Sequence, residues 1–117
     1  MQHDMKPICE EFSKGNFQAV YPYFADDVQW IMVGDQVMKG KEEVIEGCEK
    51  MLQEITVDTL INTSVTCDTN RIAIEGYCEF LNSESIPATV YYCDVYHFES
   101  NVIKSIASYA ISQKKEV

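Results

Sequence analysis

Apolar residues recur at helical spacing three times in the first half of the chain. The three stripes are Met5, Ile8, Cys9 and Phe12; Phe17, Val20, Tyr21 and Phe24; and Val44, Ile45, Cys48 and Leu52. Positions i, i+3, i+4 and i+7 lie on one side of an α-helix, so we expect a helix at each stripe, the last over residues 41–53. Residues 13–16 separate the first two helices, with Gly15 as a C-terminal cap, and Pro22 predicts an irregular second helix.

The second half of the chain is typical of β-strands. Residues 71–81 and 88–99 alternate between two faces, residues 55–67 are rich in β-branched side chains, and residues 102–112 form the last expected strand. A short hairpin over 28–33 and 36–38 is expected earlier, after a turn at 25–27. Short turns, one of them at 82–85, join the long strands, so these strands should pair antiparallel.

This order of elements predicts one α+β domain. Its 117 residues suit a single domain, and no linker, repeat or low-complexity tract divides it. Amphipathic helices have to cover one side of a long sheet, because neither element can hide its apolar face alone. We therefore expect a curved antiparallel sheet wrapped around the N-terminal helices, with a conical pocket between them, in a single domain over residues 1–117.

Charge and composition exclude several classes of partner. The net charge is −10, from 19 acidic and 9 basic residues, so nucleic acid and anionic membranes should be repelled. No apolar run approaches the roughly 20 residues of a membrane span, and the first residues lack the apolar core of a signal peptide. A cytoplasmic location follows as the expectation. Five cysteines without a Cys-x-x-Cys motif predict buried free thiols rather than disulfides or a zinc ribbon.

Three blocks of sequence resemble the nuclear-transport-factor-2-like (NTF2-like) superfamily, in its SnoaL-like and ketosteroid-isomerase-like branch. They are Tyr-Phe-Ala-Asp-Asp-Val-Gln-Trp at residues 23–30, Gly-Lys-Glu-Glu-Val at 40–44, and Asp-Val-Tyr-His-Phe at 94–98 with Ile-Lys-Ser-Ile at 103–106. The resemblance implies the cystatin-like, NTF2-like α+β cone, commonly paired into dimers through the outer sheet face. It does not imply one activity, because this fold carries isomerases, cyclases, hydrolases and binding modules.

Ketosteroid isomerase uses an aspartate base together with a tyrosine and a protonated aspartic acid that hold the oxyanion. Counted from the shared blocks, the base position falls near Met32 and the tyrosine position near Ile8, and neither residue can play that role. The protonated-acid position is matched by Asp94. Steroid isomerisation by this mechanism is therefore not expected, and no cofactor is implied.

Asp94 is the candidate catalytic residue, as an acid/base or an oxyanion donor. It lies between Tyr92 and Tyr96 on one face of the expected strand, in an otherwise apolar run. If that face lines the cavity, burial should raise the pKa of its carboxyl group. The alternative is a structural acid that is hydrogen-bonded to the backbone or paired with Arg71 or a lysine.

The other candidates are ligand-binding residues: Trp30, Met32, Tyr92, Tyr96 and Ser108. Their indole, thioether and hydroxyl groups could contact a flat, mostly apolar ligand, although aromatic packing explains the same residues. His3 and His97 fall on different elements, so no metal site is expected.

The expected function is binding of a small, largely apolar molecule in the cavity, with cofactor-free proton-transfer chemistry of an isomerase or cyclase type left open. Two alternatives remain, a non-catalytic ligand-binding domain and a protein-interaction or dimerisation module. The apolar Tyr91 and Val95 on the outer face predict a homodimer through the sheet.

Overall fold

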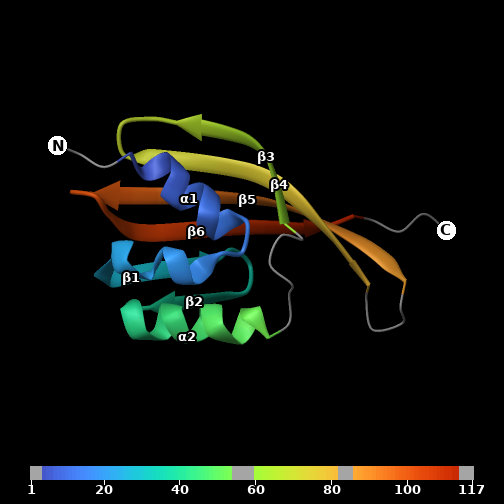
Figure 1. Ribbon diagram of the computed structural model, residues 1–117. Helices are drawn as coiled ribbons and strands as arrows, with labels where there is room; N and C mark the ends of the chain where they lie inside the picture. The colour runs from blue at the N-terminus through green and yellow to red at the C-terminus, as the bar shows by residue number, and fades with distance from the viewer. Residues whose placement is uncertain (1–3, 54–59, 82–85, 114–117) are drawn as a thin grey trace.

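The computed structural model describes residues 4–53, 60–81 and 86–113 (Figure 1). The elements in order are α1 (Met5–Ser13), the short 3₁₀ helices η1 (Phe17–Ala19) and η2 (Tyr21–Tyr23), β1 (Phe24–Met32), β2 (Gln36–Lys39), α2 (Lys41–Leu52), β3 (Leu60–Cys67), β4 (Arg71–Leu81), β5 (Pro87–Glu99) and β6 (Val102–Ser112). The expected α+β class is confirmed. Residues 55–59 of one expected strand and the expected turn at 82–85 lie outside the described residues.

The six strands form one sheet in the order β2-β1-β6-β5-β4-β3. Neighbours are antiparallel with one exception, since β1 runs parallel to β6. The sequence did not predict this pairing, because it joins the early hairpin to the last strand, and α2 and the strands β3, β4 and β5 lie between them along the chain. In Figure 1, β4 and β5 are long and bent, while α1 and α2 lie on the same side of the sheet.

Two local expectations were wrong. The second helix is a pair of 3₁₀ turns rather than an α-helix, and Pro22, which lacks an N–H and fixes φ, lies inside the second of them. Residues 25–27 belong to β1 instead of a turn. The register of β1 against β6 shifts between Phe24 and Gln29, so this stretch is an irregularity within a strand that begins at Phe24.

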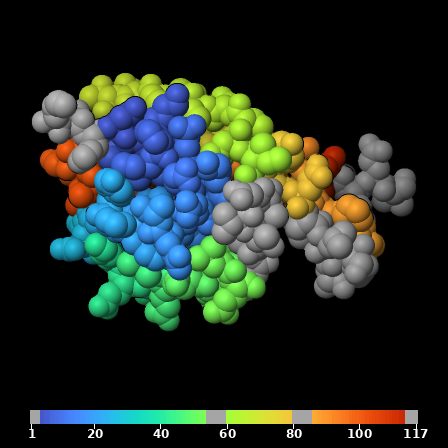
Figure 2. Space-filling model, in the orientation of Figure 1, coloured from blue at the N-terminus to red at the C-terminus, as the bar shows by residue number. Residues whose placement is uncertain are grey.

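Aromatic rings from the helical layer and from the sheet meet at Phe12. Its ring centre lies 4.7 Å from that of Phe17, 5.1 Å from that of Trp30 and 6.0 Å from that of Tyr96. Phe12 is 2% exposed, and α1 covers this part of the sheet in the space-filling view (Figure 2). Edge-to-face packing of this kind adds to the burial energy and fixes the position of α1 on the sheet.

All five cysteines are free thiols. Cys9 and Cys48 are fully buried as expected, but Cys67 is exposed at the end of edge strand β3, so the prediction of uniformly buried thiols was wrong. Among the described residues, no helix has both the length and the apolar character needed to cross a membrane.

Candidate functional site

Asp94 points from the middle of β5 toward the helical layer and is 8% exposed. Strand alternation puts Tyr92 and Tyr96 on the same side, and both are buried. Neither Arg71 nor a lysine forms a salt bridge with Asp94 among the described residues, where the ion pairs are Lys14–Glu11 and Lys104–Asp27. The carboxyl group is therefore buried without a cation beside it.

Two serine hydroxyls contact the Asp94 carboxyl group. Ser13 Oγ, from the last residue of α1, donates to Oδ2 over 2.8 Å, and Ser108 Oγ, directly opposite on β6, donates to Oδ1 over 2.7 Å. Trp30 Nε1 donates in turn to Ser108 Oγ over 2.9 Å. This series of hydrogen bonds thus joins β1, β6, β5 and α1 through polar atoms inside an apolar layer.

The hydrogen bonds continue beyond Ser13. Its hydroxyl lies 2.5 Å from that of Tyr96, and Tyr96 in turn donates to the main-chain oxygen of Cys9 over 3.1 Å. No buried side-chain nitrogen or oxygen of the described residues lacks a hydrogen-bond partner. A fully satisfied network of this kind holds its members in one arrangement, because breaking any link leaves a buried polar atom without a partner.

Burial raises the pKa of Asp94 above its ordinary value, because the charged form loses its hydration. The hydrogen bonds from Ser108 and Ser13 act in the opposite direction, since hydroxyl donors favour the carboxylate. Burial, with the nearby Asp94 carboxyl, also raises the pKa of Tyr96 well above its ordinary value. The site therefore favours neutral groups.

A narrow hollow of about 140 Å³ opens beside Asp94. Its lining is almost entirely apolar; the described residues around it are Phe12, Ser13, Phe17, Trp30, Met32, Met51, Leu60, Cys78, Val90, Tyr92, Asp94, Ser108, Tyr109 and Ala110. Their polar members from the network are Ser13, Asp94 and Ser108. An apolar hollow with one polar spot has the character of a small-ligand site.

Five of the six residues expected at the site line this hollow: Trp30, Met32, Tyr92, Asp94 and Ser108. Tyr96 does not. It is fully buried beneath the hollow, and its hydroxyl is held by Ser13 and by the Cys9 main chain, so it supports Asp94 rather than facing the space.

The side chain of Tyr92 passes over Gly76 of the neighbouring strand and reaches the edge of the site. Its hydroxyl donates to Asn62 Oδ1 over 2.7 Å, and Asn62 Nδ2 donates to the main-chain oxygen of Glu10 over 3.0 Å. The ring crosses Gly76, its cross-strand neighbour, where any Cβ would collide with the Tyr92 hydroxyl and with the Ile61 main-chain oxygen. Glycine at position 76 thus lets Tyr92 tie β5 to β3 and α1.

Sequence reasoning missed Ser13. The sequence pattern assigns it to the break after the first helix, yet it is 2% exposed and touches both Asp94 and Tyr96. The signal was present, because Ser13 follows Met5, Cys9 and Phe12 at i+8 on the same helical face. A small hydroxyl residue that continues an apolar stripe indicates a polar contact inside the core.

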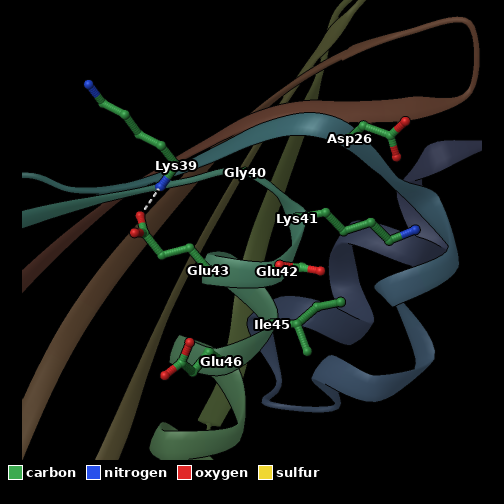
Figure 3. A pocket seen from close by; sticks show the side chains of 8 residues that line it. All are labelled: Asp26, Lys39, Gly40, Lys41, Glu42, Glu43, Ile45 and Glu46. Carbon is green, nitrogen blue, oxygen red and sulfur yellow. Dashed lines mark hydrogen bonds between the residues drawn. The ribbon is translucent and has the colours of Figure 1, made fainter.

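A larger depression of about 830 Å³ lies at the surface where α2 begins (Figure 3). Charged side chains dominate its lining: Asp26, Lys39, Lys41, Glu42, Glu43 and Glu46, with Gly40 and Ile45. Glu43 accepts a hydrogen bond from the Lys39 main-chain N–H, while Lys39, Lys41 and Glu46 point in different directions in Figure 3. These groups do not converge on one point, so the depression is a solvated helix end.

Comparison with known proteins supports the architecture. The family model of the SnoaL-like domain matches residues 8–106. An NTF2-like protein of unknown function from Cytophaga hutchinsonii ATCC 33406 is 45% identical, with a TM-score of 0.86 over 91% of this chain and 95% of that one. No protein with a curated description matches the sequence.

More distant structures share the fold alone. An NTF2-like protein of unknown function from Burkholderia pseudomallei K96243 is 18% identical, with a TM-score of 0.70 over 89% of this chain and 85% of that one. A protein from Jannaschia sp. CCS1, described by its likeness to SnoaL-like polyketide cyclases, is 9% identical, with a TM-score of 0.73 over 91% and 83%. The match over most of its length shows that this chain belongs to the SnoaL-like domain family of the NTF2-like superfamily.

Proposed function

We propose that this protein binds one small, largely apolar molecule in the hollow between α1 and the sheet, beside Asp94. The observation that carries the proposal is an apolar space of about 140 Å³ with one buried acid at its wall. An engineered cavity of roughly 150 Å³ with apolar walls holds benzene, so the space suits a single ring. Stacking on the Trp30 indole and contacts with the Met32 thioether would supply most of the affinity.

Methionine methyl groups provide the direct test. Met32 and Met51 line the hollow, whereas Met5 is buried in the core and does not. In a titration with benzene followed by ¹³C-methyl NMR, the signals of Met32 and Met51 should shift with one saturable curve while that of Met5 stays in place. Equal shifts of all three, or none up to the solubility of benzene, would contradict the proposal.

A variant that fills the hollow with a larger side chain, compared with a matched variant on the other face, provides the control. Val90 lines the hollow, while its neighbour Thr89 faces the other side of β5. Val90→Phe should abolish the benzene shifts by occupying the space, and Thr89→Phe should leave them unchanged. Binding that survives Val90→Phe would place the ligand elsewhere.

Catalysis by proton transfer is the second candidate, and the network around Asp94 favours it. Burial raises the pKa of Asp94, which is the direction that a general acid requires. Cys78 and Tyr92, which also line the hollow, have pKa values raised by burial and stay protonated. Without a second group that changes its charge, binding is the stronger proposal. Exchange of a ring-ketone α-proton with solvent deuterium, abolished in Asp94→Asn, would support catalysis.

The outer sheet face supports a proposed homodimer. Tyr91, Tyr109 and Ile111 lie side by side there and are 49%, 45% and 68% exposed. They border a groove of about 330 Å³ in which Glu75 is the charged residue among the described lining. A second copy fits this face best, because a chain of net charge −10 can meet itself only where few charges lie.

Light scattering during size-exclusion chromatography tests the dimer. At micromolar concentration the mass should be about twice that of one chain, and Ile111→Lys should halve it. Ala19→Lys adds the same charge on the exposed 3₁₀ helix of the other face and should leave the dimer intact. A monomeric wild-type protein would refute this interface.

A further inference from the structure

The donors of the network around the hollow are already used by other protein groups. Trp30 Nε1 donates to Ser108, and the Ser108 and Ser13 hydroxyls donate to Asp94. The Tyr92 hydroxyl donates to Asn62 outside the hollow. Indole and hydroxyl groups each carry one polar hydrogen, so these residues have none left for a ligand.

Tyr109 and Cys78 complete the set of donor side chains on the described lining. Tyr109 pairs with Cys93 and is 45% exposed, so strand alternation turns its side chain to the outer face, away from Ser108. The Cys78 thiol is only a weak donor. A ligand in the hollow therefore meets no free side chain that is a strong hydrogen-bond donor among the described lining residues.

Acceptor capacity remains, in contrast. A hydroxyl oxygen has two lone pairs and a carboxyl group about four acceptor positions. Ser108 Oγ accepts one hydrogen bond, from Trp30, and Asp94 Oδ1 accepts one, from Ser108. Each of these oxygens, both from residues that line the hollow, can accept one more.

The protonation state of Asp94 does not alter this result. Five short contacts link Trp30, Ser108, Asp94, Ser13, Tyr96 and the Cys9 carbonyl. The ionised site has four polar hydrogens for them, one each from Trp30, Ser108, Ser13 and Tyr96. A proton on Asp94 Oδ2 that points at Ser13 fills all five, since Ser13 then donates to Tyr96 and Tyr96 to Cys9. In both states every hydrogen is used inside the network.

We propose that the hollow selects an uncharged, ring-sized molecule that donates a hydrogen bond through an O–H or N–H group, and discriminates against the matching carbonyl compound. This selectivity rests on the proposed binding function. Ser108 Oγ and Asp94 Oδ1 accept the hydrogen bond, and the aromatic walls hold the ring. Carboxylate ligands are excluded, because the described lining contains no cation.

Cyclohexanol and cyclohexanone form the test pair, since they share ring and oxygen and differ in the O–H. Dissociation constants come from the Met32 and Met51 methyl shifts, with cyclohexane as the apolar reference. The alcohol should bind about fivefold more tightly than the ketone, the effect of one net hydrogen bond. Equal affinities, or a tighter ketone, would overturn the selectivity while leaving the binding function intact. Failure of all three compounds to bind would overturn both.

Ser108→Ala should give the hollow the free donor that it lacks. Without the serine oxygen, the Trp30 N–H has no acceptor on the wall of the hollow. The variant should bind cyclohexanone about fivefold more tightly than the wild type does, and adding Trp30→Phe should remove that gain. Cyclohexanol can accept from Trp30 and still donate to Asp94, so its affinity should not fall. Thermal melts establish that both variants fold. A cyclohexanone affinity that stays unchanged in folded Ser108→Ala would show that Ser108 does not keep the Trp30 donor from a ligand, and would overturn the selectivity.

If Ser108→Ala fails to fold, the wild-type ratio of the two affinities remains the test, and Tyr77→Phe is its control. Tyr77 neighbours Cys78 on β4, so its side chain faces the other side of the sheet and does not line the hollow. Removing its hydroxyl should keep the alcohol-to-ketone ratio within about twofold of the wild type. A ratio that collapses in this variant would contradict the assignment of the acceptors to Ser108 and Asp94.

Discussion

Ser13 and Asp94 are 81 positions apart in the sequence, yet the Ser13 hydroxyl donates to the Asp94 carboxyl over 2.8 Å inside the core. The bond fastens the end of α1 to the middle of the sheet. It also fixes part of the wall of the hollow, because both residues line that space. This one contact therefore fixes both the position of α1 on the sheet and part of the wall of the hollow.

Ser13→Ala should destabilise the fold by about 1–3 kcal/mol, because it removes one of the hydroxyl donors to a buried carboxyl group and a neighbour of Tyr96. The pKa of Asp94 should also rise further, since the Ser13 hydrogen bond lowers it. Urea unfolding measures the first effect and carboxyl NMR the second. A pKa of Asp94 that falls in this variant would show that the contact does not favour the carboxylate.

Asp94→Asn should remove a pH dependence of stability. The pKa of Asp94 in the folded state lies above its ordinary value of 3.8, so the folded protein holds that proton more tightly than the unfolded chain. Its contribution is fully present below 3.8 and is lost as pH rises through the folded pKa. Within that window wild type should lose up to about 1.4 kcal/mol per pH unit relative to Asp94→Asn.

Urea unfolding of both proteins between pH 4 and 8 measures this difference. The asparagine is a suitable control because its amide can donate to Ser13 and accept from Ser108, as a neutral acid does. A difference between the two proteins that stays constant over this range would show that Asp94 has an ordinary pKa.

Gly76→Ala and Gly47→Ala should act in opposite directions. A Cβ at position 76 collides with the Ile61 main chain and with Tyr92, so Gly76→Ala should cost about 1–3 kcal/mol and release the Tyr92 hydroxyl from Asn62. A Cβ at position 47 meets only the Met38 side chain, which can move, and alanine favours the helix by about 1 kcal/mol. Thermal unfolding should rank the wild type between them; equal effects would contradict the packing described for Tyr92.

Tyr96→Phe should cost about 1–2 kcal/mol, because the Cys9 carbonyl and Ser13 both lose a partner in a fully buried place. Tyr109→Phe removes the same atom from a residue that is 45% exposed and should stay within about 0.5 kcal/mol of wild type. Denaturant midpoints compare the two. A Tyr96→Phe variant as stable as the wild type would show that the hydrogen bonds of the Tyr96 hydroxyl do not stabilise the fold.

Much of the fold could be predicted from spacing alone. The stripe of Met5, Cys9 and Phe12 predicted α1, and strict alternation predicted β4 and β6 to the residue. Periodicity reports which face of an element is buried, but not which distant strand lies beside it. The parallel pairing of β1 with β6 and the irregular start of β1 were missed for that reason.

The site was predictable where it followed strand parity and hidden where it depended on tertiary contacts. Alternation along β5 placed Asp94 toward the core, and the structure places Trp30, Met32 and Ser108 around it. Whether a hydroxyl faces the space or another protein group is decided by neighbours from other elements. The Tyr96 hydroxyl is hydrogen-bonded to Ser13 and to the Cys9 carbonyl, and the Tyr92 hydroxyl is hydrogen-bonded to Asn62. No pattern within β5 indicates these partners.

The most direct measurement is a ¹³C NMR titration of the Asp94 carboxyl carbon, with and without saturating benzene. If the acid borders a space that holds an apolar ligand, its pKa lies above 3.8 in the free protein and rises further when the ligand removes remaining water. An Asp94 carboxyl that titrates at its ordinary value and does not respond to benzene would contradict the account.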